Sequence, residues 1–150
     1  MGNRDAEGGM VEDVSSGAVA RVRLLEAQLE RLLCSMVIAF DEDCRSALPE
    51  DHGIYRIFDR KTPGETIRAG RTNSAAGGLR QRVYQNHLMG DQDGNLRKQL
   101  VAGQVCANLD EAKAYIRERL AVQVLVVEDK DERTWLEYFM LAVLRPRYLG

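Results

Sequence analysis

Residues 134–144 are almost entirely apolar and contain one ionised side chain, Glu137. An unpaired charge in apolar surroundings is costly, so such a carboxylate is expected to have a partner. One interpretation is an ion pair with Arg133, one helical turn earlier. The other is a carboxylate that faces a polar site and binds a hard divalent cation through oxygen. The residue and its neighbours leave both interpretations open.

Four further side chains could take part in phosphate chemistry, but each also has an ordinary structural explanation. Tyr55 lies in a β-branched and aromatic segment, where tyrosine usually packs in a core or at an edge. Arg80 and Arg82 follow a loop of small polar residues and could be solvated charges on a helix. His87 is a lone histidine, which by itself is more typical of a structural residue. The order of these residues is more informative than any one of them.

Three regions are expected along the chain. Residues 1–16 are rich in glycine, serine and acidic residues without periodicity, which predicts a flexible tail. Apolar residues then recur at three- and four-residue steps, which predicts an amphipathic helix over 17–40. A connector completes this second region, 17–52, and Pro49 discourages continuation of the helix. Residues 53–150 form the third region.

The patterning of residues 53–150 predicts an α+β domain. Runs of β-branched and aromatic residues predict strands over 53–58, 66–70 and 121–127. Helical periodicity and capping residues predict helices over 79–88, 95–102, 110–120 and 129–144. This order is typical of a small, mostly antiparallel three-stranded sheet flanked by helices, here preceded by the amphipathic helix.

The apolar stripe of the 17–40 helix must be buried against something. It can pack on the domain that follows, or it can pair with the same helix of a second copy in a homodimer. The stripe is too short to decide between these. It consists of Val22, Leu25, Leu29, Leu32 and Met36.

The net charge of −2 hides a separation of charge along the chain. Residues 1–52 carry a net charge of −6, residues 53–103 a net charge of +5, and residues 104–150 a net charge of −1. Salt screens fields beyond about 8–10 Å, so only local charge matters to a polyanion. The middle third can therefore bind nucleic acid although the whole chain is acidic.

Nothing in the composition indicates a membrane or secreted protein. No apolar run approaches the roughly 18–20 residues that a spanning helix needs, and the first residues lack the apolar core of a secretory signal. Cys34, Cys44 and Cys106 show no Cys-x-x-Cys spacing and are interpreted as free thiols of a reducing compartment. A cytoplasmic or nucleoid-associated location is expected.

Over about 100 residues the chain resembles the GIY-YIG nuclease family. Four elements occur in the family's order: Gly53-Ile54-Tyr55, a returning strand that ends at Gly70, Leu79-Arg80-Gln81-Arg82 leading to His87, and Glu137 alone in the last helix. Together they form a more specific signal than the tripeptide alone. The resemblance implies the fold of the family's catalytic domain and hydrolysis of DNA phosphodiester bonds.

The second motif departs from the family. It should read Tyr-Ile-Gly, and here it reads Arg68-Ala69-Gly70. At this place Arg68 would contact the scissile phosphate or help Tyr55 to lose its proton, or it marks a domain that binds without cutting. An ungapped match of residues 79–83 favours Arg82 over Arg80 as the catalytic arginine.

The resemblance implies hydrolysis with a single ion. Glu137 would hold one Mg²⁺ or Mn²⁺, Arg82 would bind a non-bridging phosphate oxygen, and Tyr55 would deprotonate the water. His87 would contact the leaving group or the phosphate. Contacts to the DNA backbone are expected from other basic side chains of the domain: Arg56, Arg71, Arg80, Arg97 and Lys98.

Two other functions stay open. One is a nucleic-acid-binding domain of the same fold that does not cut, and the other is an oligomerisation protein in which the 17–40 helix matters most. The first 52 residues are acidic and are therefore not expected to recognise DNA bases. Specificity would then come from the domain's loops, from dimerisation, from a structured substrate or from a targeting partner protein. Restriction, repair, recombination and mobile-element roles are all compatible.

Overall fold

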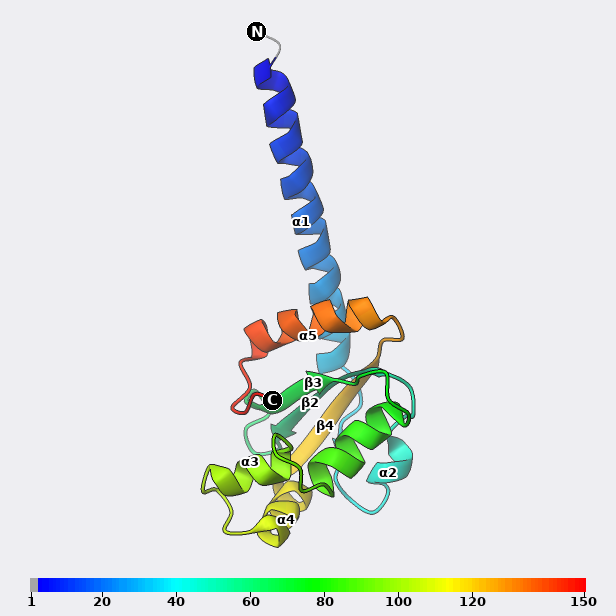
Figure 1. Cartoon of the computed structure of the whole chain (residues 1–150), viewed down its shortest axis with the longest axis vertical. Helices are drawn as coiled ribbons and strands as arrows, with labels where there is room; N and C mark the ends of the chain where they lie inside the picture. Colours follow the sequence, from blue (N-terminus) through cyan, green and yellow to red (C-terminus); the bar gives the residue numbers. More distant parts are fainter. Residues whose placement is uncertain (1–2) are drawn as a thin grey trace.

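The computed structural model of the chain describes residues 3–150, with side chains from residue 13 onward. Its centre is an antiparallel sheet of four strands in the order β1-β4-β2-β3. The strands are β1 (Ile38–Ala39), β2 (Gly53–Asp59), β3 (Thr66–Arg71) and β4 (Leu120–Val126). Helices lie on both sides of this sheet, so the fold is α+β (Figure 1).

Strands β2 and β3 form the hairpin that the sequence predicts. Tyr55 lies opposite Gly70, and Ile57 lies opposite Arg68. Because side chains alternate between the faces of a sheet, these four residues share one face. Strand β3 is the outermost strand on its side of the sheet.

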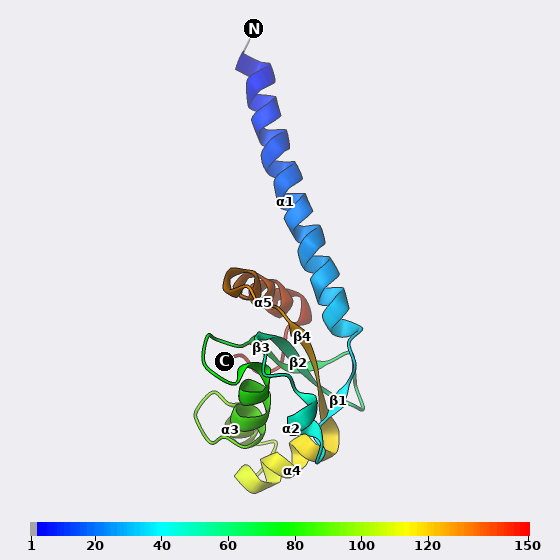
Figure 2. The same ribbon diagram turned by 90° about the vertical axis from the view of Figure 1, so that its right-hand side faces the viewer.

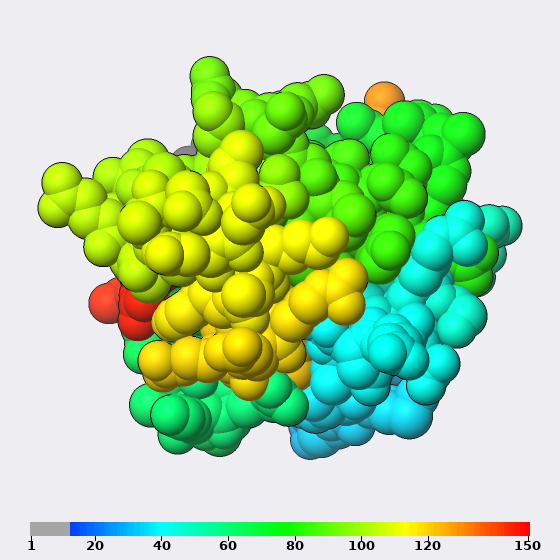
Figure 3. Space-filling model, turned by 90° about the horizontal axis from the view of Figure 1, so that it is seen from below, coloured from blue at the N-terminus to red at the C-terminus, as the bar shows by residue number. Residues whose placement is uncertain are grey.

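Different helices cover the two faces (Figure 2). The face that carries Tyr55 packs against α2 (Cys44–Ala47), η1 (Arg80–Leu88), α3 (Leu96–Ala102) and α4 (Leu109–Arg119). Figure 3 shows α2, α3 and α4 side by side over this end of the domain. The opposite face packs against α5 (Lys130–Leu144) and the last turns of α1 (Asn3–Leu33).

The prediction of a three-stranded sheet is wrong, because residues 38–39 add a fourth strand beside β4. Helix α1 ends at Leu33, and the Ser35 hydroxyl donates to the Leu32 carbonyl at 2.6 Å just beyond it. Met36 continues the apolar periodicity of the sequence, but its side chain is 78% exposed. Ile38 instead pairs with Val122 of β4 and enters the core. The helical spacing of Met36 is therefore coincidental.

Helix α1 begins at Asn3 and projects from the domain as a single helix (Figures 1 and 2). The predicted flexible tail is therefore helical from Asn3 to residue 16, and residues 1–2 lie outside the described residues. No proline interrupts this segment, and each added residue extends the helix by one backbone hydrogen bond. Within residues 3–150, no helix is both long and apolar enough to cross a membrane.

Candidate active site

Residues 80–88 wind as a π-helix, η1, where the sequence predicts an ordinary α-helix. The hydrogen bonds of a π-helix join residues five apart, the separation of Arg82 and His87, and the charge of Arg82 acts on the His87 ring. Gly77 and Gly78 precede this helix with φ of 94° and 52°, values that glycine adopts readily.

Inside the core, the Tyr55 hydroxyl and His87 Nε2 lie 2.6 Å apart. The Leu96 N–H donates to His87 Nδ1 at 3.0 Å. Nδ1 therefore carries no proton, and the proton of the neutral ring lies on Nε2, which donates to Tyr55. Burial, together with Arg68 and Arg82 nearby, holds the pKa of His87 well below its usual value. The imidazole is thus a neutral donor at pH 7.

This position corrects the predicted role of His87. Both ring nitrogens are occupied inside the core, so the ring does not reach a leaving group or a phosphate. His87 instead fixes the Tyr55 hydroxyl in place. A hydrogen bond donated to a phenol oxygen also stabilises the form that has lost its proton.

Gly70 makes room for the Tyr55 hydroxyl. A Cβ atom at residue 70 would lie 2.7 Å from Tyr55 Oη, closer than real Cβ atoms approach, and 3.0 Å from Cζ, which is also tight. The hydroxyl therefore reaches across to β3, the outermost strand. The glycine of the second motif has a steric role that does not depend on the residue at position 68.

Glu137 reaches the same end of β3 from α5. Its Oε2 accepts a hydrogen bond from the Arg71 N–H at 2.9 Å, and its Oε1 lies 3.3 Å from Arg71 Nε. Arg133 is buried and donates instead to the carbonyl oxygens of Val127 and Glu128. Glu137 thus has the arginine partner that one interpretation of the sequence requires, but the partner is Arg71 rather than Arg133.

Tyr55 and Glu137 approach adjacent residues of β3, Gly70 and Arg71, but they come from the two different faces of the sheet. These two contacts and the covalent geometry of one peptide unit place the phenol oxygen within about 10 Å of the carboxylate. Tyr55 is fully buried, whereas the Glu137 side chain is 19% exposed. Near this end of β3, the Tyr55 phenol is therefore buried, whereas the Glu137 carboxylate is accessible to solvent.

The two candidate arginines of η1 differ in their contacts. Arg80 donates from Nε to the Leu48 carbonyl at 3.0 Å and from Nη1 to Glu50 at 2.9 Å, which fastens η1 to the segment before β2. Arg82 is partly exposed, and within the described part of the chain no ion pair or side-chain hydrogen bond engages it. Its charge lies close enough to His87 to lower the pKa of that ring. Arg82 is therefore the arginine available to a ligand.

Arg68, at the position of the family's second tyrosine, is 2% exposed. Its Nη1 donates to the Gly94 carbonyl at 2.8 Å and to Gln99 Oε1 at 2.7 Å. The guanidinium thus links β3 to α3 and to the loop before it. A buried group with these partners does not contact a phosphate, so that predicted role is not supported. The charge of Arg68 still acts on the site through His87.

The structure does not support the predicted DNA contact of Arg56. The side chain is buried on the face opposite Tyr55 and donates to Thr66 Oγ1 at 2.8 Å, to Gln123 Oε1 at 3.1 Å and to the Pro63 carbonyl. Burial lowers the pKa of this guanidinium. Arg56 braces β2 against its neighbouring strands.

The other predicted DNA contacts stay predictions. Arg71 is partly exposed but is paired with Glu137. Arg97 and Lys98 lie on α3, are partly exposed, and form no ion pair within residues 3–150. Helix α3 packs on η1, which carries Arg82. Arg82, Arg97 and Lys98 therefore lie on η1 and α3, the helix that contains His87 and the helix that bonds to it.

Glu137 is the one metal ligand that the sequence predicts. Among the described residues, no group of three or more histidine, cysteine or acidic side chains could hold an ion. A single carboxylate still suits Mg²⁺, which keeps several waters and uses one or two carboxylates together with substrate phosphates. Arg71 Nε lies at ion-pair distance but makes no aligned hydrogen bond, so a cation would replace only a loose contact. The residues fit one hydrated ion shared with a phosphate.

Several groups that complete the site are not predicted from the sequence. The backbone N–H of Leu96 fixes the His87 tautomer, and Gln99 holds Arg68. The Thr72 hydroxyl accepts from the Gly53 N–H at 3.1 Å and bonds His52 Nδ1 at 3.0 Å. The sequence cannot show which backbone N–H will bond to His87. The one sequence feature that could have indicated Thr72 is its position directly after β3.

Comparison of the chain with protein-family models, with curated proteins and with solved structures finds no match. Function must therefore be inferred from the geometry of the chain and from its motifs.

Proposed function

We propose that this chain is a metal-dependent endonuclease that hydrolyses DNA phosphodiester bonds with a GIY-YIG-like catalytic domain. One set of contacts supports the proposal: the Tyr55 hydroxyl lies against Gly70, Glu137 accepts from the adjacent Arg71 N–H, and the charge of Arg82 acts on His87, the partner of Tyr55. Tyr55, Arg82 and Glu137 are the residues that the motif resemblance selects. The net charge of +5 over residues 53–103 suits a polyanionic substrate.

Hydrolysis joins a water oxygen to phosphorus, breaks the bond from phosphorus to the leaving oxygen, and moves a proton from the water to that oxygen. The motif resemblance assigns Tyr55 the task of accepting the water's proton, which then passes to the leaving oxygen. The Nε2–H of His87 donates to the Tyr55 oxygen and so holds the hydroxyl in place. Tyr55 is fully buried, so this role requires its hydroxyl to become accessible to water when DNA binds.

Arg82 binds a non-bridging oxygen of the scissile phosphate, as a guanidinium fork does well. Glu137 would hold the ion, exchanging its contact with Arg71 Nε for it. One bound Mg²⁺ or Mn²⁺ would supply positive charge at the phosphate and at the leaving oxygen. The Arg71 N–H keeps the carboxylate oriented throughout, because it bonds the other oxygen.

The decisive experiment is nicking of supercoiled DNA by the full chain, with and without Mg²⁺. We expect Mg²⁺-dependent cleavage that Glu137→Gln abolishes, because the amide keeps an acceptor for Arg71 but loses the charge that holds the ion. Glu128→Gln is the matched control, since Glu128 is exposed and its side chain has no partner within the described residues. Cleavage by Glu137→Gln at the parent's rate would remove Glu137 from the mechanism.

A second candidate is a nucleic-acid-binding domain of the same fold that does not cut. The burial of both Tyr55 and Arg68 favours it, since neither side chain meets solvent in this conformation. Such a domain binds DNA with an affinity that falls with salt and shows no metal-dependent product. A panel of linear, supercoiled, branched and single-stranded DNA, each with and without Mg²⁺, separates the two candidates.

A further inference from the structure

The N-terminal part of α1 exposes apolar side chains along a helix that the domain does not cover. Leu29 and Leu32 are buried against α5 and the sheet. Toward the N-terminus the same helix leaves the domain, and Val14 and Leu24 are 73% and 68% exposed. A single projecting helix gains little from its own backbone, so its stability depends on burying such a surface.

A groove between α1 and α5 lies beside this exposed surface. It has a volume of about 830 Å³, and Leu24, Trp135, Arg21 and Arg31 line it. Trp135, the chain's single tryptophan, is 61% exposed there. Exposed tryptophan and arginine beside apolar side chains are typical of the centre of a protein interface.

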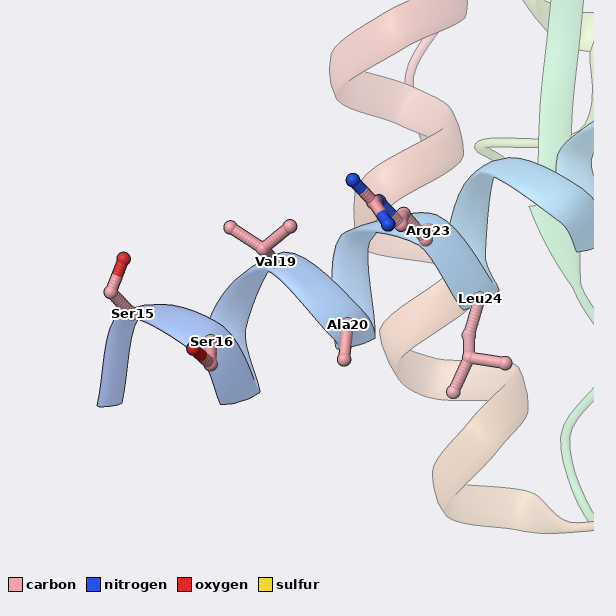
Figure 4. A pocket seen from close by; sticks show the side chains of 6 residues that line it. All are labelled: Ser15, Ser16, Val19, Ala20, Arg23 and Leu24. Carbon is pink, nitrogen blue, oxygen red and sulfur yellow. The ribbon is translucent and has the colours of Figure 1, made fainter. Parts of the chain in front are cut away.

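A second depression on α1 does not qualify as a site. Figure 4 shows that it consists of side chains of one helix alone, with Val19 and Leu24 on opposite sides of the ribbon. It is a shallow surface with no second wall. The groove against α5 is the only one of the two with residues from two elements.

We infer that the occupant of the α1–α5 groove is α1 of a second copy of this chain, running antiparallel. Charge along the helix sets the direction. Residues 3–16 contain four acidic residues and one basic residue, whereas residues 17–33 contain three arginines and two glutamates. In an antiparallel pair, the acidic half of each helix lies along the basic half of the other, including Arg21 and Arg31 in the groove.

The same charges argue against DNA as the occupant. Residues 1–52 carry a net charge of −6, which repels a polyanion. Apolar side chains such as Leu24 and Val14 also gain little from a phosphate backbone. Two antiparallel copies of α1 are complementary in charge, because each acidic half faces a basic half. A twofold interface requires such self-complementarity. This inference does not rest on the proposed cleavage.

The test uses the full chain in sedimentation equilibrium. We expect the parent to behave as a dimer of the 16.9 kDa chain, and Leu24→Glu to weaken the dimer at least tenfold. Val19→Glu, an identical change on the opposite side of α1, should leave the dimer intact (Figure 4). A monomeric parent, or equal effects of the two variants, would overturn the inference. Leu24 is exposed, so circular dichroism should show both variants folded.

Fluorescence gives an independent reading, because Trp135 is the chain's single tryptophan. On dilution of the parent, its emission should shift to longer wavelength as the groove empties, and Leu24→Glu should show the shifted emission at every concentration. Emission of the parent that stays constant through dissociation would place the interface elsewhere.

Cross-linking tests the direction. In a Cys34→Ser background, Val14→Cys chains are mixed with Leu24→Cys chains; the two other cysteines are buried. Burial raises the pKa of Cys44 to about 11, which keeps that thiol unreactive. An antiparallel pair places residue 14 of one copy near residue 24 of the other, so the mixed disulfide should dominate. Predominant Val14→Cys homodimers would mean a parallel pair and would overturn the proposed direction.

Discussion

The Tyr55 hydroxyl lies 2.6 Å from Nε2 of His87, and this bond joins strand β2 to helix η1 across the larger core of the domain. The Leu96 N–H, bound to the other ring nitrogen, extends the link to α3. One neutral imidazole therefore ties three elements together. Any catalytic role of Tyr55 depends on this hydrogen bond, because it occupies one lone pair of the phenol oxygen and leaves the other available.

The Tyr55–His87 bond predicts energetic coupling between the two side chains. His87→Phe orphans the Leu96 N–H and the Tyr55 hydroxyl, at a cost of about 1–3 kcal/mol for each buried group. In a Tyr55→Phe background one of these groups is already gone, so the second change should cost less. Urea unfolding of the two single variants and the double variant measures this. A coupling near zero would show that the bond contributes nothing to folding.

The same histidine predicts lower stability in acid. The unfolded chain protonates His87 near the usual pKa of 6.5, whereas the folded ring stays neutral because burial and nearby arginines lower its pKa. Below pH 6.5 the unfolded state binds one more proton, so stability present above this pH is lost as the pH falls. The loss from this group is at most about 1.4 kcal/mol per pH unit. Melting temperatures between pH 8 and pH 5 test it, and His87→Phe should flatten the dependence.

Gly70 predicts a steric test of the same centre. Gly70→Ala places a Cβ 2.7 Å from Tyr55 Oη and should lower the unfolding free energy by about 1–3 kcal/mol, as overpacking does. Tyr55→Phe removes the nearest atom, so Gly70→Ala should cost less in that background. Gly64→Ala serves as the control, since nothing lies within 4 Å of its added Cβ. Equal costs at the two glycines, measured by urea unfolding, would contradict the close approach.

Much of the fold could be predicted because its elements have strong local patterns. The run at 121–127 matches β4, and the polar residues before α4 supply its cap, since Asn108 accepts from the Glu111 N–H. The end of α1 could not be predicted, because Met36 keeps the helical spacing while long-range pairing with β4 claims Ile38. The π-winding of η1 is equally invisible, since no local pattern distinguishes it from an α-helix.

The candidate site was less predictable, because it depends on which side chains are buried. Arg56, Arg80 and Arg82 are all plausible phosphate ligands in the sequence, yet only Arg82 lacks a partner within the described residues. The sequence does not show whether a given arginine is buried or paired. That depends on residues far along the chain, such as Gln123 for Arg56 and Glu50 for Arg80. The partner of Glu137 is likewise a residue far along the chain, whereas sequence reasoning favours a neighbour on the same helix.

Variants of the two arginines of η1, Arg80 and Arg82, distinguish a role in stability from a role in cleavage. Arg80→Ala removes two bonds to the segment before β2 and should lower stability, by about 1 kcal/mol for a partly exposed pair. Its nicking rate per folded molecule should stay at the parent's level. Arg82→Ala removes no ion pair or side-chain hydrogen bond within the described residues, so its melting temperature should match the parent's. Loss of one phosphate contact in the transition state should slow nicking about a hundredfold. If Arg80→Ala lost cleavage while Arg82→Ala retained it, the catalytic arginine would be Arg80.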